Sequence, residues 1–263
     1  LTKKLAKKLI YDIDDMVFLN NVSEANKIVL PLKGKKKIIK LMIYADHVIT
    51  TTPTLGRFIR KYNKNITLIP STVDTEKYKI KQDYTLHHPP VIGWSGSHST
   101  SKYLKILEPV FENLYIKNID FQVLVIGDED FNFSNSKIPL TKVAWDINTE
   151  INYLYQIDIG LHPLIDERWI YGKLGAKTLI YMSIGIPTIA SANGNNFYII
   201  SDAENGFLVP INDLDLWERR IIQLLSDNEL REKIGKKGRE TVEAYYSLEA
   251  NKNKYLSILE SMI

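Results

Sequence analysis

Small residues and lysines follow predicted strands at two places in the chain. The segment Gly93–Thr100 lies between a strand and a helix, and in residues 160–210 a strand leads through a polar loop to a helix predicted to open near Lys173. Small residues let a backbone approach a ligand, and the N–H groups at a helix start favour negative charge. Such segments at the carboxyl ends of parallel strands predict a site for an anionic ligand. A simpler alternative is that Ser99 or Thr100 only caps the helix.

Two lysines lie near the predicted start of the second helix. Lys173 stands where the helix is expected to open, a position in which a cation is unfavourable unless an anion is close. We therefore expect Lys173 to face phosphate. Lys177, one turn further along, is interpreted as a solvated residue on the helix face.

Composition excludes several classes of function. The 263 residues are 44% hydrophobic and 25% charged, which describes an ordinary globular protein, and the net charge of +3 is too small to predict a nucleic-acid partner. With no cysteine there can be no disulfide, thiolate metal site or cysteine nucleophile, which fits a reducing, cytoplasmic location. No apolar run is long enough to span a membrane, and no signal peptide is visible.

Strands alternate with helices along the chain, which predicts an α/β fold with parallel sheets. Two of the predicted helices lie near Thr100–Leu114 and over Leu230–Tyr246. We expect residues 1–76 to be the C-terminal part of one Rossmann-like domain and 77–90 to be a linker. Residues 91–246 then form a second Rossmann-like domain, and 247–263 a last helix. Because Leu1 stands so close to the strand predicted at Leu9–Asp12, we expect the first domain to be incomplete.

Residues 157–210 resemble the donor-sugar half of the retaining glycosyltransferases of family 4, which have the GT-B fold. That family's pattern runs P-x-x-x-E-x-F-G…L-E-A-M-A-x-G-x-P-V-V-A…G-x-L-V-P. The residues in register with it are Pro163, Tyr181-Met182-Ser183, Gly185, Pro187, Ile189-Ala190, Gly194 and Gly206-Phe207-Leu208-Val209-Pro210. Residues 69–74 (IPSTVD) are similar to the family's hinge element, I-P-N-G-V-D. The resemblance implies two Rossmann-like domains, with the last helix crossing back to the N-terminal one.

The resemblance also implies a function: transfer of a sugar from a nucleotide-diphosphate-sugar to a glycan or lipid-linked acceptor, with retention at the anomeric carbon. The nucleotide-sugar is a substrate, so no cofactor is expected, and GT-B enzymes generally need no metal. Such enzymes are thought to work without a protein nucleophile, so the protein positions the reactants and stabilises charge.

Matching the family's phosphate motif G-R-x-x-x-x-K to Gly96 places Ser97 at the arginine and Lys102 at the lysine. Lys102 and Lys173 would then stabilise the leaving diphosphate. Backbone N–H groups near Gly96-Ser97 and Leu174-Gly175 would cradle it. Trp145 follows a strand where the family tends to place the nucleobase, although a core tryptophan fits that position equally well.

Two glutamates of the family pattern are missing. Their positions hold Gly172 and Ile180. Asp166 and Glu167 in the preceding loop are the remaining candidates to bind the hexose, or are solvated loop charges. The missing glutamates leave open a non-catalytic relative that only binds nucleotide-sugar.

The acidic run Asp12–Asp15 allows three interpretations: a D-x-D metal motif, a haloacid-dehalogenase phosphatase site, or a strand-end turn. Gly127–Asp130 resembles that phosphatase's distal acidic motif, but Met16 stands where its first motif has Thr or Val. We favour the turn, with no metal site.

A group of lysines lies in the N-terminal part of the chain. It comprises Lys3, Lys4, Lys7, Lys8, Lys33, Lys35, Lys36, Lys37 and Lys40. Such a group predicts either peripheral contact with an anionic membrane, at its inner face, or a solvated basic surface.

Overall fold

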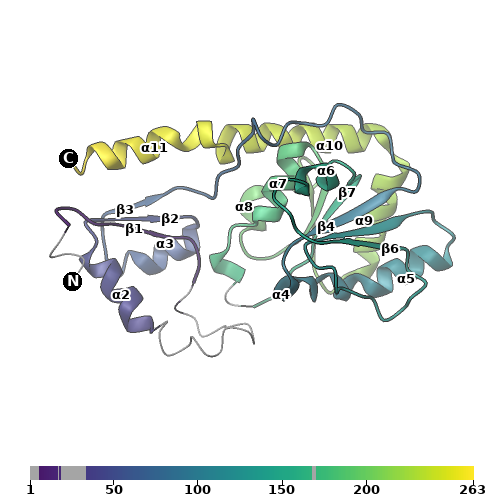
Figure 1. The fold of residues 1–263 in the computed structure, drawn as a ribbon, viewed down its shortest axis with the longest axis horizontal. Helices are drawn as coiled ribbons and strands as arrows, with labels where there is room; N and C mark the ends of the chain where they lie inside the picture. Colours follow the sequence, from purple (N-terminus) through teal and green to yellow (C-terminus); the bar gives the residue numbers. More distant parts are fainter. Residues whose placement is uncertain (1–5, 17, 19–33, 168–169) are drawn as a thin grey trace. The chain divides into compact units, whose positions relative to one another are not determined.

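The computed structural model describes residues 6–16, 18, 34–167 and 170–263. The chain forms two compact units, which we describe separately (Figure 1). Unit 1 comprises Leu1–Thr72, Asp166–Leu174 and Leu248–Ile263, and unit 2 comprises Val73–Ile165 and Gly175–Ser247. Both are α/β units in which every strand pair is parallel, as predicted.

The centre of unit 2 is a six-stranded sheet with the order β6-β5-β4-β7-β8-β9. Its strands are β4 (Val91–Ser95), β5 (Gln122–Ile126), β6 (Leu140–Val143), β7 (Ile159–His162), β8 (Thr188–Ser191) and β9 (Phe207–Val209). Starting from β4, the chain adds two strands on one side and then three on the other, which is the order of a Rossmann fold. The direction of winding therefore reverses between β4 and β7.

Helices cover both faces of this sheet. They are α4 (His98–Ser101), the 3₁₀ turn η2 (Leu104–Leu107), α5 (Glu108–Ile116), α6 (Glu150–Leu154), α7 (Ala176–Ile184), α8 (Asn196–Ile199), α9 (Leu214–Ser226) and α10 (Asn228–Thr241). Helix α5 packs beside α9, and α7 beside α10 (Figure 1). Trp94, Phe111 and Trp217 belong to one apolar cluster, whereas Tyr181 and Ile184 belong to another. Burial on both faces explains the continuous apolar runs of β7 and β8.

Two predicted helices have different boundaries in the structure. The helix expected near Thr100–Leu114 is divided into α4, η2 and α5. Pro109 lies in the first turn of α5, where its missing N–H and its ring prevent a continuous helix from the preceding turn. The helix expected over Leu230–Tyr246 ends as α10 at Thr241 and continues as one π turn, Val242–Tyr246.

Residues 77–90, expected to be a linker, belong to unit 2 and contact α10 through two buried arginines. Arg231 donates from Nε to the carbonyl of Tyr84 at 3.0 Å. Arg239 donates to the carbonyls of Tyr78 and Thr75. Hydrogen bonds from charged donors are stronger than neutral ones, so this segment is firmly held on unit 2.

Asp158, at the start of β7, holds the end of the same segment. Its buried carboxylate accepts hydrogen bonds from the backbone N–H groups of His87 (3.1 Å) and Val91 (2.8 Å). It also bonds to His87 Nδ1 at 2.9 Å, and Lys81 Nζ lies 4.0 Å away. One carboxylate thus satisfies two backbone donors at the entry to β4.

Unit 1 contains a three-stranded sheet with the order β1-β2-β3. Its strands are β1 (Ile10–Ile13), β2 (His47–Thr50) and β3 (Ile66–Leu68), and its helices are α2 (Lys35–Tyr44), α3 (Pro53–Ile59), the 3₁₀ turn η3 (Ile170–Gly172) and α11 (Leu248–Glu260). Ile258 of α11 packs with Ile49 and Ile69. Among the helices in the described part of the chain, none is long and apolar enough to cross a membrane.

Replacing Asp158 by Ala should lower the free energy of unfolding of unit 2 by about 2–4 kcal/mol, because the buried N–H group of Val91 and the partly buried one of His87 lose their acceptor. Denaturant unfolding of wild type and variant measures the change. The control is Asp120→Ala, at an exposed aspartate on the same unit, which should change stability little. Equal stabilities for the wild type and Asp158→Ala would contradict this role.

Candidate functional site

The candidate site lies beyond the carboxyl ends of β4 and β7. In open parallel sheets, ligands bind beyond the strand ends where the winding direction reverses. Gly96 follows β4 directly, and Pro163 follows β7. The fold therefore brings the glycine loop (residues 96–99) and the first residues of the polar loop (163–165), both singled out in the sequence, to the same edge of one sheet.

The loops that follow β4 and β5 are in close contact. The N–H of Gly96 donates to the carbonyl of Ile126 at 2.9 Å, and the N–H of Gly127 donates to that of Val143 at 2.8 Å. Gly127 has a φ of 99°, and a Cβ there would lie 2.2 Å from the Gly96 oxygen. Only glycine fits at Gly127. The Gly96 N–H, predicted to help cradle phosphate, is already used within the sheet edge.

Tyr181 fixes the last residue of β4. Its buried hydroxyl oxygen accepts a hydrogen bond from the N–H of Ser95 at 2.6 Å. Burial raises the pKa of Tyr181, so the phenol stays neutral. The glycine loop therefore begins from a rigid strand end, and the first group that it presents outward is Ser97, whose hydroxyl lies 3.0 Å from that of Ser99.

The prediction that the second helix opens near Lys173 was wrong by about one turn, since α7 begins at Ala176. The shift places Lys177 in the first turn of α7. Its side chain crosses the glycine loop: a Cβ at Gly96 would lie 2.4 Å from Lys177 Cε and 2.8 Å from Nζ. Nζ also lies 5.1 Å from the centroid of the Trp94 ring. Lys177 is half-buried, not the solvated residue expected from the sequence.

Four of the predicted site residues belong to unit 1. Lys173 Nζ lies 3.4 Å from Oδ2 of Asp15. Asp166 accepts a hydrogen bond from the Tyr171 hydroxyl at 2.6 Å. Glu167 is half-buried and Leu174 is buried. The other predicted residues lie in unit 2: Gly96, Ser97, Lys102, Trp145 and Gly175.

His162 ends β7 and is buried. Its Nδ1 lies 2.8 Å from Oγ1 of Thr178 in α7. Burial lowers the pKa of His162 well below its usual range, and the positive charge of Lys177 lowers it further. His162 is therefore neutral in the folded protein. Sequence patterns do not single out His162, because its partner lies sixteen residues away on another element.

Gly175 is the N-cap of α7 and has close neighbours. A Cβ there would lie 2.6 Å from Oδ1 of Asn196 and 3.3 Å from Cε1 of His162. Gly175 has no side chain that could cap α7, so the N-cap residue supplies no acceptor to the first-turn N–H groups. The positive end of α7 therefore favours an anion at this edge of the sheet.

An exposed histidine and a buried aspartate lie beside the glycine loop. His98 Nδ1 is 3.1 Å from Oδ1 of Asp128, the residue after the Gly127 turn. Burial alone would raise the pKa of Asp128, but hydrogen bonds with Ser101 and His98 outweigh it and hold that pKa below its ordinary value. Asp128 is therefore an anion that orients His98.

Trp145 follows β6 and is 57% exposed, so the alternative that it is a core tryptophan was wrong. Its Cβ lies 3.6 Å from the position that a Cβ at Gly127 would take. The indole ring is thus a flat surface next to the glycine turns. Aromatic side chains of this kind can stack on a planar base.

Partial burial raises the pKa of Asp12, and the charge of Asp14 raises it further. Within the described ranges, no group of three or more His, Asp or Glu side chains is arranged to hold a metal ion. Asp12 and Asp128, which a dehalogenase site would combine, belong to different units. The backbone carbonyl of Asp14 accepts a hydrogen bond from the Thr51 hydroxyl at 3.1 Å, and Met16 N–H donates to the Asp15 carboxylate at 2.7 Å.

Residues 76–241 match the model of the family described as glycosyl transferases group 1, which covers more than half of the chain. The chain belongs to this family. Its fold is the α/β GT-B type with Rossmann-like parallel sheets, as predicted. The family match favours the glycosyltransferase interpretation over the dehalogenase alternative.

Two curated relatives and one solved structure illustrate this similarity. The lipopolysaccharide core biosynthesis glycosyltransferase LpsE of Rhizobium meliloti is 33% identical over 88 residues, which are 34% of this chain and 26% of LpsE. The capsular polysaccharide biosynthesis glycosyltransferase CapM of Staphylococcus aureus is 24% identical over 186 residues, covering 66% and 47% of the two chains. The chain thus spans about half or less of the length of these relatives.

The solved structure is HepE from Anabaena in complex with UDP-glucose. It aligns with a TM-score of 0.72 and 14% identity over 97% of this chain and 72% of HepE. At this identity the likeness concerns the fold. It shows that this chain shares its fold with HepE.

Replacing His162 by Gln should reduce the loss of stability on acidification. The pKa of histidine returns to about 6.5 in the unfolded chain, so below that pH the unfolded chain binds a proton that the folded protein excludes. The contribution of His162 is therefore complete above about pH 6.5 and falls below it by up to about 1.4 kcal/mol per pH unit. Denaturant unfolding at pH values on both sides of about 6.5 measures this slope.

The matched control is His88→Gln, at an exposed histidine of the same unit, which should keep the wild-type slope. The idea fails if His162→Gln and the wild type lose stability equally between neutral and mildly acidic pH.

Proposed function

We propose that this chain is the donor-binding part of a retaining glycosyltransferase of family 4. It would move a sugar from a nucleotide-diphosphate-sugar to a glycan or lipid-linked acceptor in polysaccharide biosynthesis. One observation carries the proposal: a group 1 domain with Rossmann strand order presents a glycine loop and an uncapped helix start at its switch point. The names of LpsE and CapM and the UDP-glucose complex of HepE support the substrate class.

The protein's part in the reaction would be positioning and charge stabilisation. The diphosphate would lie between the glycine loop and the start of α7, with Lys102 stabilising the charge that develops on the leaving group. Trp145 would stack on the nucleobase. His162 is unsuited to act as a base, because it is buried away from the acceptor and burial lowers its pKa, which makes the imidazole a weak proton acceptor. The same-face attack of the acceptor hydroxyl would then rely on the leaving diphosphate to take the proton.

Asp166 and Glu167 remain the candidates to bind the hexose hydroxyls. The chain has no carboxylate at Gly172 or Ile180. This departure favours a second candidate function, a relative that binds nucleotide-sugar without turning it over. In both cases lysine side chains supply the charge at the diphosphate, and we propose no cofactor or metal requirement.

Calorimetric titration with UDP, GDP and ADP, with and without magnesium, tests the proposal. We expect metal-independent binding of at least one of them, and turnover of the matching nucleotide-sugar separates an enzyme from a binding relative. If none of the three binds at millimolar concentration, the proposed function is wrong.

The variant Lys102→Met should lower nucleoside-diphosphate affinity roughly ten- to hundredfold, because a charge-assisted bond to phosphate is worth about 1.5–3 kcal/mol. Affinity for the uncharged nucleoside should stay the same. The matched control is Lys105→Met, at an exposed lysine one turn further along whose Nζ lies 5.8 Å from the Phe131 ring. Equal losses in the two variants would count against a specific role for Lys102.

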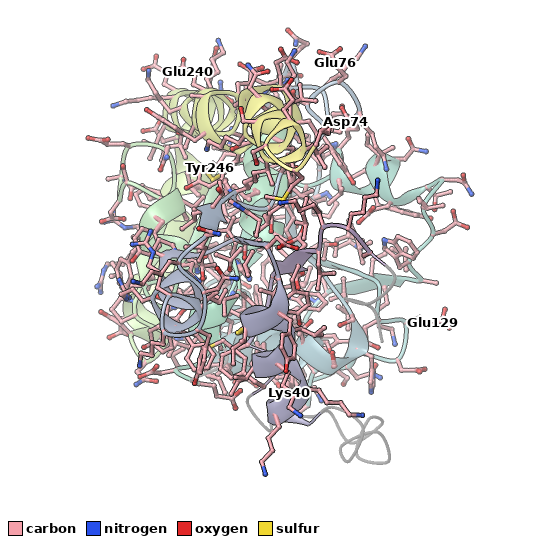
Figure 2. The ribbon with its side chains drawn as sticks, turned by 90° about the vertical axis from the view of Figure 1, so that its left-hand side faces the viewer. Lys40, Asp74, Glu76, Glu129, Glu240 and Tyr246 are labelled. Carbon is pink, nitrogen blue, oxygen red and sulfur yellow. The ribbon has the colours of Figure 1, made fainter. Side chains whose placement is uncertain are left out.

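We further propose that unit 1 contacts an anionic membrane, at its cytoplasmic face. Lys36, Lys37 and Lys40 are exposed on α2, and Lys7 and Lys8 are exposed before β1. Figure 2 shows the Lys40 side chain extending from α2 away from the ribbon. Lys3, Lys4 and Lys33 of the same group lie outside the described residues. Lipid-linked acceptors would be met at such a surface.

Sedimentation with vesicles of phosphatidylglycerol and phosphatidylcholine, compared with phosphatidylcholine alone, tests this contact. Each lysine near an anionic surface contributes about 1 kcal/mol, so replacing Lys36, Lys37 and Lys40 together by Gln should weaken binding roughly a hundredfold at low salt. Wild-type protein that sediments equally with both vesicle types would refute the contact.

The control replaces three lysines of α10, Lys233, Lys236 and Lys237, by Gln. It removes the same charge from unit 2, so it should bind the anionic vesicles like the wild type if α2 carries the contact.

A further inference from the structure

We propose that Lys177 is the cation that holds the donor's diphosphate beside Gly96, the role that the sequence assigned to Lys173. This inference rests on the proposed function and names a positioning residue within it. It follows from where α7 begins, which the sequence did not reveal.

The Lys177 side chain reaches the glycine loop. From the first turn of α7 it runs across the end of β4, so that the position of a Cβ on Gly96 is 2.8 Å from Nζ. The ammonium group therefore lies at the glycine loop itself, on the side of the sheet edge where the chain leaves β4. Glycine at position 96 leaves room for this lysine, which is a separate reason for its small size.

The positive charge of Lys177 lies in the first turn of α7. The start of a helix carries partial positive charge, so a lysine in the first turn of α7 is unfavourable by itself. The face of the Trp94 ring, 5.1 Å from Nζ, offsets part of this cost. An anion bound between Lys177 and the uncapped first turn would be attracted by both positive groups.

The His162 and Ser97 side chains near this lysine carry no positive charge. Lys177 is close enough to His162 to lower its pKa, and that histidine is neutral. The residue after Gly96 is Ser97, which is exposed and uncharged. Lys177 thus brings a positive charge to a loop whose other side chains do not supply one at that point.

Lys173 belongs to unit 1 and not to the sheet edge of unit 2. Its Nζ lies 3.4 Å from the Asp15 carboxylate of the same unit. Lys177→Met and Lys173→Met are therefore a matched pair: each removes one ammonium group, only four residues apart in the chain, and keeps most of the apolar stem.

The experiment measures the affinity of each variant for the nucleoside diphosphate that the wild type binds, and for the corresponding nucleoside. We expect Lys177→Met to weaken diphosphate binding ten- to hundredfold, with the nucleoside unaffected. Lys173→Met should stay within about threefold of the wild type. Thermal unfolding of both variants checks that unit 2 is intact.

Lys177→Arg separates charge from packing. Arginine keeps the charge and stacks well on an aromatic ring, so it should retain diphosphate affinity within about threefold. If Lys177→Arg loses as much affinity as Lys177→Met, the side chain acts through packing on Trp94 and the inference is overturned.

The inference is also overturned if Lys177→Met binds the diphosphate like the wild type. That result would leave the proposed function standing, because the wild type would still bind the nucleotide. Failure of the wild type to bind any nucleoside diphosphate refutes the proposed function instead. Should Lys177→Met fail to fold, the comparison of Lys177→Arg with Lys173→Met decides, since a charge role requires the arginine variant to bind.

Discussion

The close approach of Gly127 to Gly96 is the contact on which the candidate site depends. The space for it exists only because the residue after β5 has no Cβ and adopts a φ of 99°. Two hydrogen bonds hold the loop after β4 at the sheet edge. The Gly96 N–H donates to the Ile126 carbonyl, and the preceding Ser95 N–H donates to the Tyr181 hydroxyl. Because this backbone is fixed from two sides, the side chains that reach the loop from α7 and β6 meet a rigid surface.

The strands and their parallel arrangement could be predicted from the sequence because buried parallel strands are continuous apolar runs bounded by Gly and Pro. Helix boundaries were harder. Pro109 divides one predicted helix, but the apolar pattern continues through it and does not reveal the break. The start of α7 has no Ser, Thr, Asp or Asn cap, and Gly175 stands there instead. Without a cap the sequence marks no start, and the predicted helix began a turn too early.

The predicted start of this helix also determines which lysine the sequence places at the phosphate. A shift of one turn moves the first turn of this helix from Lys173 to Lys177, the lysine that we propose for the diphosphate. Trp145 could not be assigned as exposed from sequence, because exposure depends on how the loop after β6 meets Gly127. The burial of His162 and its contact with Thr178 could not be predicted from sequence, because the fold alone brings these two residues together. The glycine loop was found from sequence alone, since a strand, a glycine and a helix follow each other directly.

We propose that a nucleoside diphosphate binds at the β4–β7 switch point of unit 2. Amide hydrogen exchange with and without saturating nucleoside diphosphate tests this binding most directly. We expect slower exchange at Ser97–Ser99 and at the first turn of α7, with the segment around Asp158 unchanged. Protection confined to Asp12–Met16 or absent from both loops would contradict the account.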